Sequence, residues 1–576
     1  MSGLAGYAFL EGAEQRAGLL QSAGSRFSGP NHDVQIYAGP GFGAVVASRF
    51  DEGREHGSFA EIHESERQVL ACEGYIVNLD DLAGVPAPER GRGALLLDLY
   101  ERHGDDLFAR LNGGYSLALW DKAEKRLVLH VAKFGQRKLF RTSAGEAVFF
   151  GSEIPILPRL SESPLSLDPA GLSSNLLAGA NYGTTTCFAG VRRVFQGSIV
   201  TLTRGGERTS LPAPMPREAT PSSAPVEELA GQLDGLMRQS VRRLLGLHPS
   251  HAVLLSSGAD SALVAAYTRE ISGRLTTITQ GMPGGDESPN AARIAAHLGS
   301  DHHGFPYHVD GQSLLDGIAT LVRIVGEPGW AQLGLPLTSI STVASRIART
   351  FANGVGGDAL FGSRSYESFD DSRQNLFDYV PQPYDPGGIR LIVPLPFGNQ
   401  DDFVSLLAPE LPSRPFDRYA VSQVMGFMSR HVIGTGSALA QQLGAEALYP
   451  YLDDDVVRFS FTLPDELKAN PQETKALLRR VLDRYVPRPF IPQGKRGYWA
   501  EALTWCYEAG SLGPALDLLS EPRTLEREIY NRANLEKLIA KYRNRQAEEG
   551  WHRILWQILS LEIFLRQLSD SGTAGA

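Results

Sequence analysis

The sequence predicts a two-domain chain that combines α+β and α/β structure, with a sheet-rich domain preceding a domain built on a parallel sheet. Three observations predict this fold class. The 576 residues exceed the length that one compact core normally covers. Short apolar runs, broken by glycine and polar clusters, fill the chain up to residue 203. Beyond a proline- and serine-rich segment, a buried-strand pattern runs directly into a helical one, which is typical of a βα unit.

The N-terminal domain is predicted to cover residues 1–203. Its strand candidates are the apolar runs at 44–48, 75–79, 115–120, 126–132 and 147–152, and its helix candidate is 94–103. Residues 204–225 are predicted to be a linker, because proline, serine, glycine and charged residues leave no periodic apolar face there.

The C-terminal domain is predicted to cover residues 226–571, followed by a disordered tail at 572–576. It opens with an amphipathic helix over 226–245. Within it, the segment 364–419 contains a proline-rich stretch, which predicts a surface insertion or a lid. The sequence leaves open whether a partner protein orders this insertion.

Composition argues against several classes of partner. The formal net charge is −10, from 55 basic and 65 acidic residues, and no basic stripe favours a nucleic acid. Cys72, Cys187 and Cys506 lie far apart, which disfavours a disulfide framework or a structural zinc site. No signal peptide and no run of about 18 apolar residues is found, so we expect a cytoplasmic protein without a membrane partner.

The segment LLSSGADSALVAA, from residue 254 to 266, carries the first chemical signal. A buried strand ends in small residues and a helix begins at once, which leaves backbone N–H groups free to meet an anion. Ser261 adds a hydroxyl, and Asp260 adds a carboxylate of the kind that Mg²⁺ shares with phosphates. The same residue types also make ordinary capped turns, so that interpretation stays open for this segment alone.

A second segment, GVGGDALFGS from residue 354 to 363, strengthens the first. It again places one carboxylate, Asp358, among small residues after a strand-like approach. Two such turns together favour a site that clamps a metal ion and a pyrophosphate group.

These two turns resemble the asparagine synthetase family. SSGADS resembles its pyrophosphate loop S-G-G-x-D-S, and GVGGDALFG resembles its segment S-G-E-G-A-D-E-L-F-G. Further similar segments are 276–303, 326–337, ALYPYLDDDVVRFSFTLPDELK, TKALLRR with QGKRGY, and WHRILWQILSLEIFLRQL. The resemblance implies an Ntn-hydrolase-like αββα sandwich followed by a parallel-sheet ATP-pyrophosphatase domain of the adenine nucleotide α-hydrolase type. It also implies an ATP-dependent C–N ligase that forms AMP.

The resemblance assigns roles to individual residues and implies ATP and Mg²⁺ as cofactors. Asp260 and Asp358 would hold Mg²⁺, and Lys495 would neutralise charge on phosphate or on the tetrahedral intermediate. The nucleotide-binding residues would be Leu255, Ser256, Ser257, Gly258, Asp260, Ser261, Gly281, Gly356 and Gly357. Two positions depart from the family: Ser257 replaces the first glycine of the loop, and Gln493 replaces an arginine.

Residues 111–157 resemble the core of a glutaminase domain, whose nucleophile is an N-terminal cysteine. Here position 2 is serine. The family segment N-G-E-I-Y-N, whose Asn and Gly stabilise the oxyanion, begins here with Glu73-Gly74, and a carboxylate there would repel an oxyanion. The aspartate expected to grip the amine of glutamine falls among Arg90–Gly93. We therefore expect a retained fold without glutaminase chemistry.

Position 355 bears on the choice of amine. Asparagine synthetases tend to carry a glutamate base there and β-lactam synthetases a tyrosine, whereas Val355 cannot accept a proton. A peptide α-amine, whose pKa lies near neutrality, needs little help from a base. The sequence therefore most resembles a lasso-peptide macrolactam synthetase (lasso cyclase), with a leader-peptide protease as a further partner. Open alternatives are an asparagine synthetase using ammonia or glutamine, another small-molecule amide or β-lactam synthetase, and a non-catalytic scaffold.

Overall fold

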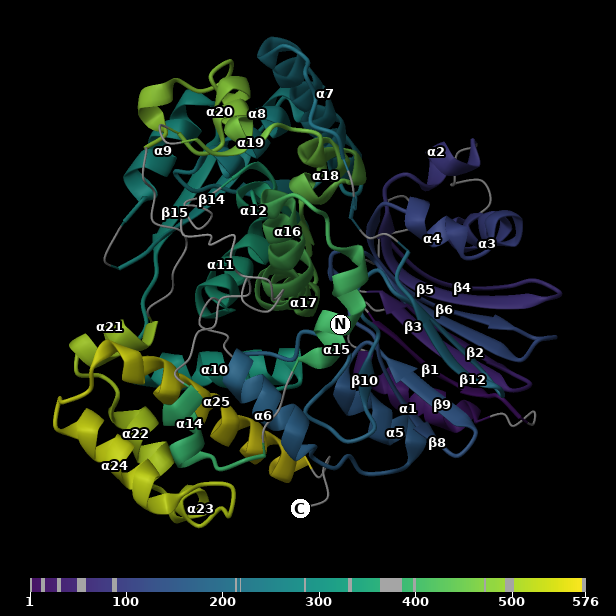
Figure 1. Ribbon diagram of the computed structural model, residues 1–576, viewed down its shortest axis with the longest axis vertical. Coiled ribbons are helices and arrows are strands. Elements are labelled where there is room, and N and C mark those ends of the chain that lie inside the picture. Colours follow the sequence, from purple (N-terminus) through teal and green to yellow (C-terminus); the bar gives the residue numbers. More distant parts are fainter. Residues whose placement is uncertain are drawn as a thin grey trace.

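The computed structural model describes most of the chain, in ranges separated by short gaps. These ranges are 3–11, 16–27, 33–48, 58–84, 91–212, 215–217, 219–283, 286–329, 334–362, 386–396, 400–470, 473–492 and 502–571. Figure 1 shows the strands of the N-terminal domain on the right, β14 and β15 at the upper left, and the last helices in yellow at the lower left. No helix in the described ranges combines the length and the apolarity needed to cross a membrane.

The N-terminal domain contains two six-stranded sheets. The first has the order β10-β8-β9-β1-β3-β2 and the second the order β12-β11-β7-β6-β5-β4. The first sheet comprises β1 (Gly3–Phe9), β2 (Asp33–Gly39), β3 (Phe42–Ser48), β8 (Phe140–Ala144), β9 (Ala147–Gly151) and β10 (Arg192–Arg193). The second comprises β4 (Ser58–Glu64), β5 (Gln68–Ile76), β6 (Gly113–Asp121), β7 (Arg126–Val131), β11 (Ile199–Thr203) and β12 (Gly206–Ser210). All pairings within these two sheets are antiparallel.

Successive side chains of each strand point to opposite faces of its sheet, and this alternation explains why the two sheets stack. On β6, Leu117 and Leu119 pack under helices, whereas Ala118 and Trp120 face the other sheet, where Trp120 stacks on Phe42 with ring centroids 5.8 Å apart. The helices α2 (Leu79–Ala83), α3 (Arg92–His103) and α4 (Asp106–Arg110) cover the second sheet. The helices α1 (Ala17–Phe27), η2 (Ile154–Ile156), α5 (Leu157–Ser161) and α6 (Pro169–Ala178) lie on the side of the first. The predicted αββα sandwich is therefore confirmed.

Most strand predictions in this domain agree with the structure, with two corrections. The runs at 44–48, 115–120, 126–132 and 147–152 correspond to β3, β6, β7 and β9, and 94–103 lies in α3. The prediction at 75–79 is wrong beyond Ile76, because β5 ends there and α2 begins at Leu79. The predicted linker 204–225 begins with β12, which pairs with β11 across a two-residue turn. Its residues are mostly exposed, so backbone hydrogen bonds hold this strand without an apolar face.

The C-terminal domain is built on a five-stranded parallel sheet of order β15-β14-β13-β16-β17. Its strands are β13 (His251–Leu254), β14 (Thr276–Gly281), β15 (Asp301–Pro306), β16 (Thr350–Ala352) and β17 (Glu446–Leu448). After β13 the chain adds β14 and β15 on one side, then returns to place β16 on the other side of β13. This change of direction makes a topological switch point between β13 and β16, where parallel sheets commonly bind ligands.

Helices surround this sheet and extend beyond it. Those nearest the sheet include α7 (Val226–Leu245), as predicted, α8 (Ala259–Ser272), α9 (Ser288–His297), α11 (Gly334–Ile347), α12 (Gly357–Phe361), η6 (Pro450–Leu452), α18 (Asp454–Phe461), α19 (Asp465–Lys468), α20 (Ala476–Leu482) and η7 (Arg488–Phe490). A second helical group contains α10 (Gly311–Val325), α21 (Ala502–Glu508), α22 (Gly513–Ser520), α23 (Pro522–Leu525), α24 (Arg532–Arg543) and α25 (Glu549–Ser571). One hydrophobic core joins this group to α1 and the outer face of the first N-terminal sheet.

The predicted surface insertion is wrong for the part that the structure describes. This part contains α14 (Pro386–Ile392), α15 (Asp401–Leu407), η4 (Ala408–Glu410) and the start of α16 (Pro415–Ser422), which leads into η5 (Gln423–Ile433) and α17 (Gly434–Gln442). Phe403, Leu407 and Phe416 are completely buried. At the start of α15, Asp402 accepts hydrogen bonds from the backbone and hydroxyls of Thr184 and Thr185 in the N-terminal domain. Residues 363–385 and 397–399, and with them most of the proposed lid, lie outside the described residues.

Candidate active site

The switch point brings the two predicted carboxylate turns together. β13 and β16 pair in parallel, with Val253 opposite Ala352, so both strands end at the same edge of the sheet. Asp260 lies in the first turn of α8, which follows β13, and Asp358 lies in the first turn of α12, which follows β16. The topology thus places at one edge two residues that are 98 positions apart in the sequence (358 minus 260).

The predicted phosphate loop, residues 255–261, is folded around its own hydroxyl groups. The backbone N–H of Ser256 donates to Ser261 Oγ at 3.0 Å, and that of Gly258 donates to Ser256 Oγ at 3.2 Å. Leu255 N donates to the carbonyl of Ile278 on β14 at 2.9 Å, which fixes the base of the loop to the sheet. Gly258 is the N-cap of α8 and supplies no side-chain cap, so the positive end of this helix is open to an anion.

Glycines allow the two turns to approach each other closely. A Cβ atom on Gly354 would lie 2.7 Å from Ser261 N, and one on Gly357 would lie 2.3 Å from Asp260 Oδ1. Gly356 has a φ of 103°, a conformation that side chains disfavour. Tyr451, fully buried beside Gly356, donates its hydroxyl to the Asp260 carbonyl at 3.1 Å. Packing therefore fixes the Asp260 backbone on two sides.

Ser257, which departs from the family loop, has a structural role. Its hydroxyl donates to Glu287 Oε2 at 2.7 Å, and its side chain is buried. Glu287 is the N-cap residue of α9, shortly after Gly281 at the end of β14. The serine therefore ties the phosphate loop to the neighbouring strand-to-helix turn. The predicted nucleotide-binding residues 255–258, 260, 261, 356 and 357 thus lie in two adjoining turns, with Gly281 on the next strand, and their binding role stays a prediction.

Lys475 is the site residue that the sequence did not single out. It forms ion pairs with both Asp260 and Asp358, and its Nζ lies 2.6 Å from Asp358 Oδ1. Burial alone would lower the pKa of Lys475, but the charge of Asp260 and then that of Asp358 outweigh it, so the pKa is raised and the ammonium form is stabilised. Lys475 lies in the TKALLRR segment, whose resemblance to the family was the available signal.

The donor set fits Mg²⁺ bound together with a nucleotide. Two carboxylates face one position at which the Lys475 ammonium already supplies a positive charge. Mg²⁺ typically takes one or two protein carboxylates and completes its shell with phosphate oxygens and water. Within the described ranges, no group of three or more His, Cys, Asp or Glu residues could hold a metal ion without such help. Lys495 and Gln493 lie outside the described residues, so the role of Lys495 stays a prediction.

The position that the sequence predicts for the oxyanion donor is occupied by a buried network of Glu73, Ser116, Arg137 and Glu446, called here the Arg137 network. Glu73 accepts from Ser116 Oγ at 2.8 Å and from Arg137 Nε at 2.9 Å. The same guanidinium donates two hydrogen bonds to Glu446 on β17, at 2.9 and 2.6 Å. Glu73 is thus neutralised rather than left as a repelling charge, yet its side chain offers no N–H donor to an oxyanion.

The segment expected to hold the glutamine-gripping aspartate is also occupied differently. Arg90 and Ser2 lie outside the described residues. Gly91 is the N-cap of α3, and the backbone N–H of Gly93 donates to Glu61 on β4 at 2.6 Å. A carboxylate from a strand thus interacts with the helix start at which a substrate amine would need an acidic partner.

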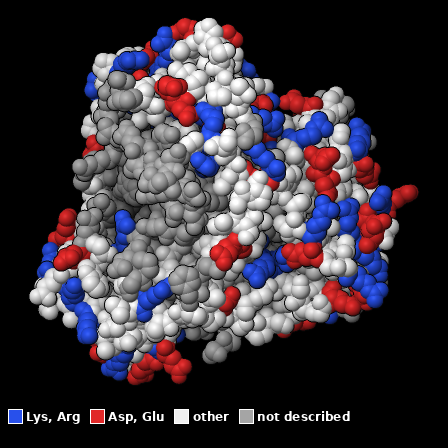
Figure 2. All heavy atoms as spheres, in the orientation of Figure 1, with Lys and Arg blue, Asp and Glu red and all other residues white. Residues whose placement is uncertain are grey.

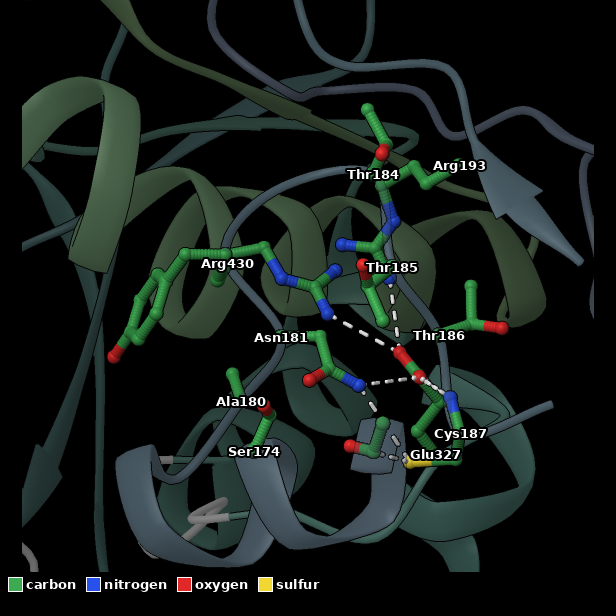
Figure 3. Close-up of polar contacts among 12 residues, drawn as sticks. Ser174, Ala180, Asn181, Thr184, Thr185, Thr186, Cys187, Arg193, Glu327 and Arg430 are labelled. Carbon is green, nitrogen blue, oxygen red and sulfur yellow. Dashed lines mark hydrogen bonds and ion pairs between the residues drawn. The ribbon is translucent and has the colours of Figure 1, made fainter. Parts of the chain in front are cut away.

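A second buried group, the Glu327 cluster, links residues of the two domains (Figure 3). Glu327 follows α10 and accepts four hydrogen bonds, from Cys187 N at 2.8 Å, Asn181 Nδ2 at 3.2 Å, Arg193 Nη2 at 3.0 Å and Arg430 Nη2 at 3.2 Å. The cavity beside it measures about 30 Å³, room for one or two water molecules and too small for a nucleotide. We assign this cluster to domain docking.

Charged side chains of both signs are interspersed on the face that Figure 2 shows, and basic residues form no continuous stripe there. The prediction that no nucleic acid binds stays a prediction, since the figure shows one face.

Comparison with known proteins covers both domains. The asparagine synthase family matches residues 232–566, and the glutamine amidotransferase domain family matches residues 61–211. A putative glutamine-hydrolysing asparagine synthetase of Mycobacterium tuberculosis is 24% identical over 91% of this chain and 92% of its own length. Glutamine-hydrolysing asparagine synthetase 1 of Bacillus subtilis is 22% identical over 76% and 74%. A solved glutamine phosphoribosylpyrophosphate amidotransferase of B. subtilis is 11% identical over 53% and 81%, with a TM-score of 0.26, too low to support an argument.

Proposed function

Because this chain belongs to the asparagine synthase family, whose members are ATP-dependent amide-forming ligases, we propose that it couples an activated carboxylate to an amine that glutamine does not supply. The Arg137 network carries the proposal. It fills the oxyanion position with a carboxylate whose oxygens accept hydrogen bonds from Ser116 and Arg137, whereas glutamine hydrolysis needs donors at that position.

In the first half of the proposed reaction, a carboxylate oxygen attacks the α-phosphorus of ATP and pyrophosphate leaves. Backbone N–H groups at the start of α8, with the hydroxyls of Ser256 and Ser261, would bind the phosphates. Asp260 and Asp358 would hold Mg²⁺, which supplies neutralisation of the charge on the leaving pyrophosphate. Lys475 adds a positive charge on the same side of the site.

In the second half, an amine attacks the carbonyl carbon of the acyl-adenylate, AMP leaves, and the nitrogen releases one proton to water. Val355 lies in the second turn, packs against the core and cannot accept a proton from this amine. The amine must therefore be nucleophilic without it, as the α-amine of a peptide is near neutral pH. We propose a substrate that carries both amine and carboxylate, as in closing the macrolactam ring of a lasso peptide after a leader-peptide protease has freed the amine.

The second candidate function is asparagine synthesis. It is favoured by the relatives, whose names are those of glutamine-hydrolysing asparagine synthetases. For this chain, the Arg137 network argues that such synthesis would use free ammonia. The two candidates share the adenylation step and differ in the amine.

The test measures AMP formation by the purified protein with ATP, Mg²⁺ and three sets of substrates. The sets are aspartate with glutamine, aspartate with ammonium, and a synthetic core peptide whose α-amine lies several residues from an Asp or Glu. AMP together with a peptide product lighter by one water supports the macrolactam proposal. Asparagine from ammonium alone supports the second candidate. Asparagine from glutamine would refute the glutamine-independent mechanism, and the Asp260→Ala variant should abolish turnover in every set.

A further inference from the structure

Lys475 lies where a metal ion would have to bind. Its Nζ interacts with Asp260 Oδ2 and with Asp358 Oδ1, the latter at 2.6 Å. Its side chain is only 10% exposed, whereas that of Asp358 is 67% exposed. The ammonium is therefore enclosed between the two carboxylates, and a divalent cation cannot take the same oxygen atoms while it stays there.

The backbone aims the lysine at this position. Lys475 has a φ of 60° and a ψ of 37°, the left-handed region that non-glycine residues seldom adopt. Its N–H donates to the carbonyl of Lys468 at 2.6 Å, and Lys468 is itself held in a buried ion pair with Asp417 at 2.8 Å. A strained conformation that is held this firmly commonly marks a functional residue.

The carboxylate of Asp260 has less freedom to move than the lysine. Asp260 lies so close to Gly357 that a single added carbon would overlap its Oδ1, and Tyr451 fixes its backbone. The lysine side chain, by contrast, has four rotatable bonds and can turn its ammonium without moving the backbone. If the ammonium of Lys475 and the carboxylate of Asp260 separate, the ammonium is therefore the group that moves.

We propose that Lys475 blocks the metal site of the nucleotide-free enzyme, so that the divalent cation enters only together with the phosphates of ATP. This inference rests on the proposed use of ATP and Mg²⁺. A metal ion alone would face a buried ammonium at close range. A metal–ATP complex brings negatively charged phosphates. These attract the Lys475 ammonium away from the carboxylates, and they balance the positive charges of both the ammonium and the metal ion. Lys475 is here a positioning residue that sets the order of binding.

The test measures Mn²⁺ binding to the whole 576-residue chain, and electron paramagnetic resonance detects the bound ion. Without nucleotide, the wild type should bind Mn²⁺ weakly, and Lys475→Met and Lys475→Gln should bind it at least about 10-fold more tightly, because the competing charge is gone. Lys475→Arg, which keeps the charge, should behave like the wild type. Adding Asp358→Asn to Lys475→Met should remove the gain, which would locate the ion at this site.

Two outcomes separate the failure of this inference from failure of the proposed function. If the wild type binds Mn²⁺ with a non-hydrolysable ATP analogue but neither neutral variant gains affinity without nucleotide, the blocking role is wrong and the ligase assignment stands. If the wild type binds no Mn²⁺ even with the analogue, the proposed metal-dependent reaction fails, and the blocking role fails with it. Circular dichroism of each variant checks that it is folded.

Discussion

Arg137→Met is the most informative perturbation of the interface between the two domains. The side chains of Arg137, Glu73 and Glu446 are 3%, 2% and 1% exposed, so the variant would leave two carboxylates buried without their cation. Removing one partner of a buried ion pair costs about 3–5 kcal/mol. Since one guanidinium serves both carboxylates, we expect the upper end, about 5 kcal/mol, a large share of the about 5–15 kcal/mol that stabilises a typical domain.

The loss of stability should depend on pH in a defined direction. In the wild type, burial raises the pKa of Glu446 above 4.5, although Arg137 opposes this, and without Arg137 this pKa rises further. Well below pH 4.5, Glu446 is protonated in both the folded and the unfolded state, and the penalty is small. As the pH rises above the pKa of the unfolded chain, the unfolded state loses its proton first and the folded state is progressively disfavoured. The variant should therefore be closer to wild type at pH 5 than at pH 8.

Urea denaturation at pH 5 and pH 8 measures the loss of stability in Arg137→Met and its dependence on pH. A triple variant without charges in the network is the control. Glu73→Gln, Arg137→Met and Glu446→Gln together remove every charge of the network, so this protein should recover at least half of the stability that Arg137→Met loses. A loss below about 1 kcal/mol in Arg137→Met, or a triple variant that is no more stable than the single one, would refute the reasoning.

Three further predictions concern the active site. Asp358→Asn should lower the rate of AMP formation at saturating ATP by at least about 100-fold with an unchanged circular dichroism spectrum, and near-normal turnover would contradict its metal-binding role. Gly357→Ala should lower the rate by about 10-fold or more, because the added carbon lies 2.3 Å from Asp260 Oδ1; a fully active alanine variant would show that Asp260 can shift without harm. Ser257→Gly, which removes the donor to Glu287 at 2.7 Å, should cost about 1 kcal/mol in thermal unfolding while adenylation continues, and loss of adenylation in a folded variant would mean that the hydroxyl binds nucleotide.

Features determined by neighbouring residues were predictable from the sequence. The alternating apolar residues of β6 and the strand-to-helix change after β13 depend on residues a few positions apart, and both were predicted. The same is true of the two carboxylate turns, because small residues and an aspartate suffice to define them. β12 escaped prediction because its residues are polar and it is held by pairing with β11.

Features determined by distant residues were not predictable. Asp260 and Lys475 are 215 positions apart, and no local pattern indicates that an ammonium lies between the two carboxylates. Glu73 was expected to be a repelling charge because its cationic partner, Arg137, lies 64 positions away in the segment after β7. The same guanidinium also binds Glu446 on β17, 309 positions further along the chain. The prolines spread through the segment 364–419 obscured the fact that Phe403 belongs to the core.

Because the Glu327 cluster takes side chains from both domains, we expect that cutting the chain between the domains would break contacts that both of them need. A ligase domain produced alone would expose Glu327 without Asn181, Cys187 and Arg193, and it would leave α10 and α25 without the apolar surface that they share with α1. Exchanging N-terminal domains with a relative would need the matching partners on both sides. In this chain the glutaminase-like domain therefore serves as a structural part of the C-terminal domain, with which it shares buried contacts.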